Sequence, residues 1–254
     1  MQRQGPIDHD WRSLAIRWGA WGAVCVALLF IAVFVELSEE VVEIDDKSER
    51  LLGVDTWVLR FVARFRRPWV NAMAVDLTAL GSPLVVALFT VTFGALLLTK
   101  ADRRGAISLV VIALASALLT SATKALLERS RPSIVPRLVE VTGLSYPSGH
   151  SLASAAVYLT AAVVLGRHVS RSGERIGFAI YAAIMVVLIG ASRVYLGVHY
   201  PSDVLGGIVL GAACAILNAV VLFRFDRRAG RSTSQSSTAL APARRAANTR
   251  TPIG

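Results

Sequence analysis

The segment SRVYLGVHYPSD, residues Ser192–Asp203, places an arginine, a histidine and an aspartate between two strongly apolar stretches. FAIYAAIMVVLIGA precedes it, and VLGGIVLGAACAILNAVVLF follows it. A membrane-spanning helix needs about 20 predominantly apolar residues, so the segment is predicted to connect two spans. Charged side chains near membrane depth are costly and usually mark a functional site.

Apolar segments of this kind recur along the whole chain. Six of them are long and nearly free of charge: 15–35, 83–99, 106–127, 152–166, 176–198 and 204–223. The short ones can be extended by small flanking residues such as Gly81 and Ser151. A set of core helices in a soluble protein is disfavoured, because too little polar chain remains to cover six such helices. The sequence therefore predicts an all-α fold, an integral membrane six-helix transmembrane bundle.

The first apolar segment has the position of a signal peptide. It is longer than the usual apolar region of about 7–15 residues, and it runs into ELSEE without a small-residue cleavage site. We therefore expect it to be a retained helix.

The basic residues predict the orientation of the helices. With the N-terminus in the cytoplasm, the inward-facing parts carry 16 of the 27 lysines and arginines, and the outward-facing connections carry 11. Short basic connections such as KADRR, residues 100–104, are typical of the cytoplasmic face. The predicted topology has both termini inside, and it explains the net charge of +10 without a nucleic-acid partner.

The last stretch of the chain differs in composition from the rest. It is rich in Ser, Thr, Ala and Arg and has no apolar periodicity, so it is not expected to bury a core. Its arginines can attract anionic lipid. The chain is therefore predicted to consist of a membrane domain, residues 1–225, and a disordered, basic cytoplasmic tail, residues 226–254.

The first outward connection, residues 36–81, is the only long one. In VDTWVLRFVARFRRPW the aromatic residues Trp57, Phe61, Phe65 and Trp69 recur every four residues, with arginines between them. This pattern is typical of an amphipathic helix lying in the membrane interface. The alternative is an amphipathic helix packed on the bundle.

In this topology, polar residues collect at the outer ends of the last four spans. They come from ATKALLERSRPS at the end of the third span, from YPSGHS at the start of the fourth, and from the segment quoted first. The candidate site residues are Lys124, Arg131, Ser148, Gly149, His150, Arg193, His199 and Asp203.

These residues form three motifs, K-x(6)-R-P, P-S-G-H and S-R-x(5)-H-x(3)-D, between residues 124 and 203. Their order and spacing resemble the signature of the type 2 phosphatidic acid phosphatase family, which shares it with vanadium-dependent haloperoxidases. PSGH alone is a weak signal, whereas three motifs in order at one membrane face are specific. The resemblance implies a membrane lipid phosphate phosphatase, a phosphohistidine on His199, and no metal or other cofactor.

The residue types suit phosphate chemistry. Phosphoryl transfer depends mostly on positioning and on electrostatic stabilisation of the phosphoryl oxygens. Lys124, Arg131 and Arg193 supply three cations, and arginine binds phosphate oxygens in bidentate fashion. Ser148 and the backbone N–H of Gly149 add donors at a helix N-terminus, where an anion is favoured.

The two histidines suit two proton-dependent roles. His199 lies four residues before Asp203, so one helical turn brings the carboxylate to one imidazole nitrogen and leaves the other to attack phosphorus. Pro201 fits the first helical turn between them. His150 then protonates the departing alkoxide and later activates water.

Taken singly, each residue also has a structural interpretation. Arg129, Arg131 and Arg137 fit loop charges at headgroup level, Lys124 fits a snorkelling helix end, and Asp203 fits an N-terminal helix charge. A lone interfacial histidine is more often structural than catalytic. Only the convergence of the three motifs favours the catalytic interpretation.

The sequence thus predicts a multi-pass cell-membrane phosphatase with its site on the extracytoplasmic side. The family implies three candidate substrates, namely isoprenoid diphosphates, phosphatidic acid and phosphatidylglycerophosphate. A lipid phosphotransferase using the same phosphohistidine remains an alternative that differs only in the acceptor. A transporter is disfavoured because the predicted spans contain almost no polar residues. A haloperoxidase is disfavoured because the chain is predicted to be an integral membrane protein. The expected partners are a lipid phosphate and membrane lipids, without nucleic acid, and the sequence sets no oligomeric state.

Overall fold

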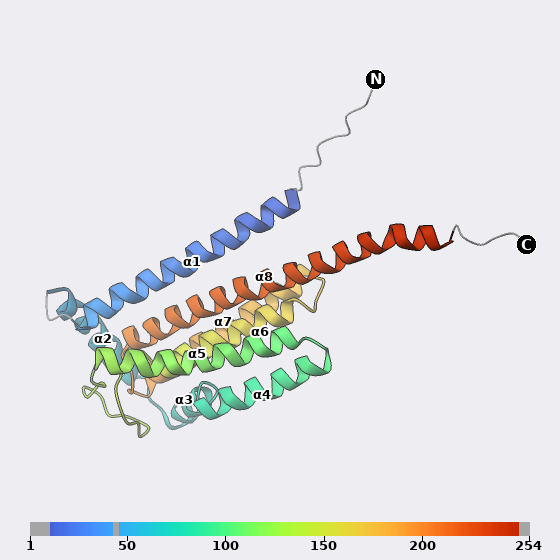
Figure 1. Ribbon diagram of the computed structural model, residues 1–254. Coiled ribbons are helices and arrows are strands. Elements are labelled where there is room, and N and C mark those ends of the chain that lie inside the picture. Colours follow the sequence, from blue (N-terminus) through green and yellow to red (C-terminus); the bar gives the residue numbers. More distant parts are fainter. Residues whose placement is uncertain (1–10, 43–45, 249–254) are drawn as a thin grey trace, which may run out of the picture.

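The chain folds as a bundle of long helices (Figure 1). The computed structural model describes residues 11–42 and 46–248, and side chains for 20–42 and 50–226. This part holds eight helices and no strand: α1 (Trp11–Val42), α2 (Asp46–Ala63), α3 (Pro68–Ala79), α4 (Pro83–Thr99), α5 (Arg103–Leu127), α6 (Gly149–Gly166), α7 (Ser172–Tyr195) and α8 (Pro201–Asn248). Five of these helices are long and apolar enough to cross a membrane, and the bent pair α3–α4 makes a sixth candidate. The predicted all-α membrane fold is confirmed.

The second span is broken. Helix α4 coincides with the predicted segment 83–99, but the length needed comes from α3, whose axis is inclined by 49° to that of α4. Ser82 caps α4 by accepting a hydrogen bond from the Val85 N–H at 3.3 Å, and Pro83 occupies the first helical position. A Cβ on Gly81 would lie 2.5 Å from Cγ2 of Ile189. Because glycine has no Cβ, the turn between α3 and α4 can pack closely against α7.

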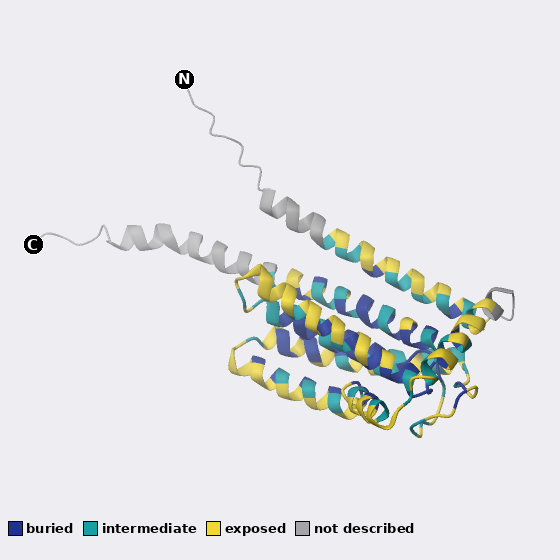
Figure 2. Ribbon diagram, turned by 180° about the vertical axis from the view of Figure 1, so that it is seen from behind, coloured by how far each residue is buried: buried dark blue, intermediate teal, exposed yellow. Residues whose placement is uncertain are grey.

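Helix α6 lies at the centre of the bundle, with α4, α5, α7 and α8 packed around it. Two glycines allow α8 to approach it closely. A Cβ on Gly207 would lie 2.6 Å from the carbonyl oxygen of Ser148, and one on Gly211 would lie 2.4 Å from that of Leu152. This small-x-x-x-small spacing is typical of close helix pairs in membranes. Buried residues concentrate on these central helices, dark blue in Figure 2.

The outer faces of the bundle are apolar. Helix α1 packs mainly on α8 and is otherwise largely exposed (Figure 2). Large side chains point outward elsewhere too, with Leu84, Leu118 and Leu126 exposed to 69%, 71% and 79%. Soluble proteins rarely expose so much continuous apolar surface, whereas a bilayer core requires it.

The predicted interfacial helix is divided in two. Helix α2 ends at Ala63 and α3 begins at Pro68. The residue before a proline is disfavoured in helical backbone. Arg67 accordingly adopts an extended conformation, with φ −140° and ψ 150°. The four aromatic side chains are distributed over α2, the turn and α3, and all are exposed rather than packed on the bundle: Trp57, Phe61, Phe65 and Trp69.

The two ends of the chain extend beyond the predicted segments. Helix α1 continues to Val42, past the predicted end at residue 35, and its candidate span is Ala20–Val42. The backbone of α8 is helical to Asn248 and crosses residue 225, where the tail is predicted to begin, although its candidate span ends at Asp226. Residues 1–10 and 249–254 lie outside the described part, and the division at residue 225 stays a prediction.

Candidate active site

The eight predicted site residues lie at one end of the bundle, opposite the end where α1 begins and α8 finishes (Figure 1). Three contacts join them directly: Arg131 lies 3.1 Å from His199, His199 lies 3.3 Å from Asp203, and the Ser148 N–H donates to the Asp203 carbonyl oxygen at 2.9 Å. Four helix ends carry five of them: Lys124 is in the last turn of α5, Gly149 and His150 are in the first turn of α6, Arg193 is in the last turn of α7, and Asp203 is in the first turn of α8. The other three are in loops: Arg131 and the cap residue Ser148 in the loop 128–148, and His199 in the loop 196–200.

His199 and Asp203 form a buried pair. The distance from Nδ1 of His199 to Oδ2 of Asp203 is 3.3 Å, and the two residues are 1% and 0% exposed. Helix α8 begins at Pro201, and Asp203 in its first turn also accepts the backbone N–H of Tyr200 at 2.8 Å. The carboxylate thus favours the tautomer with the proton on Nδ1, which leaves the lone pair on Nε2.

Burial determines the protonation of His199. Removal from water lowers the pKa of His199 to about 4, although the hydrogen bond and the charge of Asp203 act in the opposite direction. The imidazole is therefore neutral at pH 5–8, the form that a nucleophile requires.

A second layer of polar groups holds Asp203. Arg129 donates from Nη1 to Oδ1 of Asp203 at 2.6 Å and from Nη2 to Oδ2 of Asp55 at 2.8 Å. The Ser145 hydroxyl donates to Oδ2 of Asp203, and the Ser202 hydroxyl donates to Asp55. Burial alone would lower the pKa of Arg129, but the two carboxylates raise it, so Arg129 stays charged.

Arg131 lies directly in front of His199, the predicted nucleophile. Its Nη1 is 3.1 Å from Nε2 of His199 and donates to the carbonyl oxygen of Val198 at 2.9 Å. Its remaining donors bond the carbonyl oxygens of Gly143 and Thr142 at 2.9 and 3.1 Å. The guanidinium therefore covers the nitrogen that would attack phosphorus.

The other two cations are held by neutral acceptors. Lys124 donates from Nζ to the carbonyl oxygen of Leu144 at 2.6 Å. Arg193 is 4% exposed and donates from Nη1 to Oγ1 of Thr78 at 2.9 Å. Its buried Nε has no hydrogen-bond partner within the described residues. Neither cation forms an ion pair with a carboxylate of the described part, so both are available to bind an anion.

The PSGH residues have strong structural roles. Ser148 is fully buried and caps α6, with its Oγ accepting from the N–H of Ser151 at 3.4 Å and from its hydroxyl at 3.0 Å. The Ser148 N–H donates to the carbonyl oxygen of Asp203 at 2.9 Å, which joins the starts of α6 and α8. A Cβ on Gly149 would lie 3.0 Å from Cγ2 of Thr120, so this glycine also permits packing on α5. Phosphate binding by Ser148 and Gly149 stays a prediction.

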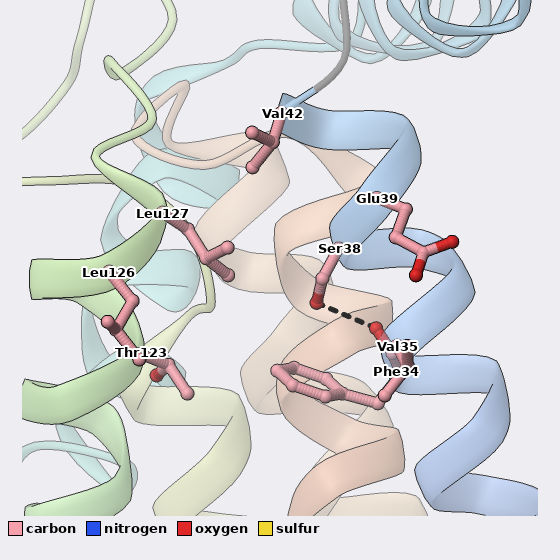
Figure 3. Close-up of a pocket in the computed structure, with 8 residues that line it drawn as sticks. All are labelled: Phe34, Val35, Ser38, Glu39, Val42, Thr123, Leu126 and Leu127. Carbon is pink, nitrogen blue, oxygen red and sulfur yellow. Dashed lines mark hydrogen bonds between the residues drawn. The ribbon is translucent and has the colours of Figure 1, made fainter.

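An apolar groove opens beside the site. It has a volume of about 330 Å³ and lies between the ends of α1 and α5 (Figure 3). Phe34, Ser38 and Leu127 point into it, and the Ser38 hydroxyl donates to the Phe34 carbonyl oxygen at 2.7 Å. The same hydroxyl contacts the Tyr146 hydroxyl at 3.2 Å, so the groove borders the residue that precedes PSGH.

The sequence did not single out the groups behind the His–Asp pair. The sequence favours a loop charge for Arg129, and no motif contains Asp55, Ser145 or Thr78. Asp55 carries the one usable signal, because it is an acidic residue at the start of the aromatic segment 54–69. Its contact with Arg129 spans 74 positions of the chain, and periodicity cannot reveal such a pairing.

Comparison with known proteins places these motifs in a family. The family model described as the PAP2 superfamily matches residues 105–228, a range that contains all eight predicted site residues. Phosphatidylglycerophosphatase B of Bacillus subtilis (strain 168) is 35% identical over 161 residues, which cover 63% of this chain and 78% of that protein. Decaprenylphosphoryl-5-phosphoribose phosphatase of Mycobacterium tuberculosis is 33% identical over 162 residues, which cover 61% of this chain and 82% of that protein.

A solved structure extends the likeness to three dimensions. The crystal structure of a transmembrane PAP2-type phosphatidylglycerolphosphate phosphatase from Bacillus subtilis matches the bundle with a TM-score of 0.71 at 28% sequence identity. The match covers 80% of this chain and 96% of that chain. The similarity therefore includes most of the helical frame as well as the motif region.

Proposed function

This chain belongs to the PAP2 superfamily, and we propose that it is an integral membrane phosphatase that removes a terminal phosphate from a lipid phosphate or diphosphate. One observation carries the proposal. A buried, neutral His199 oriented by Asp203 lies at the same end of the bundle as three cations and a second histidine. The similar proteins are named as phosphatases of lipid phosphates, one with a glycerolipid and one with a prenyl lipid.

The reaction begins with binding of the phosphate by Lys124, Arg131 and Arg193. Nε2 of His199 attacks phosphorus, and the bond between phosphorus and the leaving oxygen breaks while a new N–P bond forms. Asp203 stabilises the positive charge that develops on the imidazole. His150 donates a proton to the leaving oxygen, which departs as the lipid alcohol or, from a diphosphate, the lipid monophosphate.

Water completes the cycle. His150, now lacking its proton, accepts one from a water molecule, whose oxygen attacks the phosphohistidine. The N–P bond breaks, inorganic phosphate is released, and His199 returns to its neutral form. In both steps, the same three cations stabilise the negative charge on the phosphoryl oxygens.

Arg131 has to turn aside before the attack. Its Nη1 covers Nε2 of His199 at 3.1 Å. A phosphate oxygen is a stronger acceptor for a guanidinium than the imidazole and the carbonyl oxygens that Arg131 now contacts, because the resulting hydrogen bonds are charge-assisted. Substrate binding thus draws the guanidinium onto phosphate and exposes the nucleophile.

The site opens to the extracytoplasmic side in this proposal, with both termini in the cytoplasm. The support is the distribution of charge between the two ends of the bundle. The end opposite the site carries the short basic connections 100–104 and 167–175, which are typical of a cytoplasmic face.

The lipid reaches the site from within the bilayer. The groove between α1 and α5 is apolar, has a volume of about 330 Å³, and is lined by Thr123, the neighbour of Lys124 in the chain (Figure 3). The candidate substrates are isoprenoid diphosphates, phosphatidic acid and phosphatidylglycerophosphate. Each of these lipids has a terminal phosphate that the three cations can bind and a hydrocarbon chain that the groove can accept.

The decisive experiment measures phosphate release from these three lipids by the purified protein in EDTA. We expect turnover that persists in the chelator and is lost in His199→Ala. The matched control is His168→Ala, which removes a histidine that also contacts a carboxylate, Asp102 at 2.9 Å, but lies at the other end of the bundle. Retained turnover in His199→Ala, or equal loss in His168→Ala, would remove His199 as the nucleophile.

A further inference from the structure

A second cavity lies at the end of the bundle opposite the candidate active site. Its volume is about 980 Å³, at the upper end of the range of about 300–1,000 Å³ for ligand pockets. Helices α1, α6, α7 and α8 surround it. Small residues make up much of its wall: Ala20, Ala23, Ala162, Ala179, Ala212 and Ala215.

The cavity results from the way α1 is packed. Helix α1 lies mainly against α8 and makes little contact with α6 and α7. Alanines on the facing sides of these helices are too short to fill the space that remains. Phe30 and Phe223 also line it, so the wall is apolar over most of its area.

Arginines line the same cavity. They are Arg167, Arg175 and Arg224, against a single acidic residue, Asp226. The carboxylate of Asp226 is already paired with Arg167 at 2.9 Å and with Arg104 at 3.1 Å.

Two of these arginines have no acidic partner within residues 20–42 and 50–226. Arg175 donates to the carbonyl oxygen of Val169 at 2.9 Å, and Arg224 lies over the Trp21 ring, 5.9 Å from its centroid. The cavity therefore combines an apolar wall with two arginines that form no ion pair among the described side chains.

These cations lie at the depth where headgroups are expected. The span in α6 ends at Gly166, that in α7 begins at Ser172, and that in α8 ends at Asp226. Arg175 and Arg224 are thus within one turn of the ends of their spans. Basic pockets between membrane helices at this depth suit anionic lipid headgroups.

We propose that this cavity binds one anionic phospholipid from the leaflet on that side, with its phosphate at Arg175 and Arg224 and an acyl chain between α1 and α7. The apolar wall matches the acyl chain, and the two arginines match the headgroup. The site is separate from the candidate active site, and its occupant is a resident lipid rather than a substrate.

The test is native mass spectrometry of the full chain in detergent, titrated with phosphatidylglycerol or with phosphatidylcholine of the same acyl chains. We expect one tightly held phosphatidylglycerol and weaker retention of phosphatidylcholine. The double variant Arg175→Gln/Arg224→Gln should weaken phosphatidylglycerol binding about thirtyfold. This follows because each arginine near the membrane surface contributes about 1 kcal/mol to the attraction of anionic lipid. Ala179→Phe, which fills the cavity from an exposed position, should reduce retention of both lipids.

Matched variants separate this site from general lipid attraction. Arg60→Gln/Arg64→Gln removes the same charge from exposed positions at the other end, and Ala117→Phe adds the same ring to an exposed position on α5. Both controls should bind phosphatidylglycerol as the wild type does. Equal binding of the two lipids, retention unchanged in Ala179→Phe, or an equal loss in the controls would overturn the proposal. Phosphate release by the same variants reports that they are folded.

Discussion

Arg129 and Asp203, with side chains 11% and 0% exposed, form an ion pair directly behind the candidate nucleophile, with 2.6 Å between Nη1 and Oδ1. The opposite oxygen of the same carboxylate faces His199. Arg129 is itself held by Asp55 at 2.8 Å, and its guanidinium lies over the Tyr200 ring, 4.2 Å from the centroid. The orientation of His199 thus depends on a chain of contacts that begins in α2.

Removal of Asp55 should therefore affect both stability and catalysis. In Asp55→Ala, Arg129 loses one of two carboxylate partners while its side chain stays largely covered. Breaking a fully buried ion pair costs about 3–5 kcal/mol, so we expect a loss of at most this size. We expect a lower unfolding temperature in detergent and a lower kcat with little change in KM, because Asp55 lies behind the His–Asp pair and does not contact phosphate.

The control for this measurement is Glu174→Ala. Glu174 contacts Arg171 at 4.0 Å in an exposed pair, and such pairs contribute about 0–1 kcal/mol. Equal unfolding temperatures for Asp55→Ala and Glu174→Ala would show that the contact between Arg129 and Asp55 is not structural.

Substitutions of the two histidines should have different effects on the reaction. His150→Ala should lower turnover of lipid phosphates about 10²–10⁴-fold, the usual contribution of a general acid. With p-nitrophenyl phosphate, whose leaving group needs no proton, the first step should survive. Radioactive phosphate should then accumulate as phosphohistidine in His150→Ala and be absent from His199→Ala. Labelling of neither variant, or of both, would contradict the assigned roles.

The sequence predicted the features that repeat or that stand in short motifs. The apolar runs predicted the helices, and the family resemblance is confirmed by the match over residues 105–228. The break in the second span is not predictable in this way, since a 17-residue apolar run such as 83–99 does not reveal that α3 completes it. The division of the aromatic helix was missed although Pro68 marked it, because the four-residue aromatic period continues across the proline.

The site was predictable only where its residues are close in sequence. His199 and Asp203 are only four positions apart, so they stay close in space although His199 lies in the loop just before α8 begins at Pro201. Asp55 and Thr78 reach the site through tertiary packing of α2 and α3, and no local pattern encodes that packing. The burial that lowers the pKa of His199 also arises from the complete bundle.

The close contact between α6 and α8 gives a stability prediction. Gly211→Ala would place a Cβ 2.4 Å from the carbonyl oxygen of Leu152, and backbone cannot move aside as a side chain can. We expect a loss of about 1–3 kcal/mol, as for other overpacked sites. Gly177→Ala on α7 is the control, because no atom lies within 4 Å of its added Cβ. This variant should be neutral or up to about 1 kcal/mol more stable. Similar unfolding temperatures for the two variants would contradict the packing described.

The groove of Figure 3 gives a prediction about substrate length. Leu127→Trp should obstruct the groove and raise KM about tenfold for long-chain lipid phosphates. A change of this size results if about two methylene groups of the lipid are no longer buried, at about 0.8 kcal/mol each. Short-chain substrates should be little affected. Leu118→Trp is the control, on the same helix but 71% exposed and away from the groove. A KM that rises equally for short and long chains would point to damage of the site itself.

His199 should make the stability of the protein depend on pH. Burial lowers its pKa from 6.5 to about 4, so between these values the unfolded chain binds a proton that the folded protein does not. Its contribution to the free energy of unfolding is therefore complete above pH 6.5 and is lost as the pH falls towards 4. Between pH 7.5 and pH 5 the loss from this group is about 2 kcal/mol. Unfolding measured in detergent should show a steeper loss for the wild type than for His199→Asn, which has no titrating ring. Parallel curves for the two proteins would mean that His199 is solvated and protonated in the folded state at pH 5.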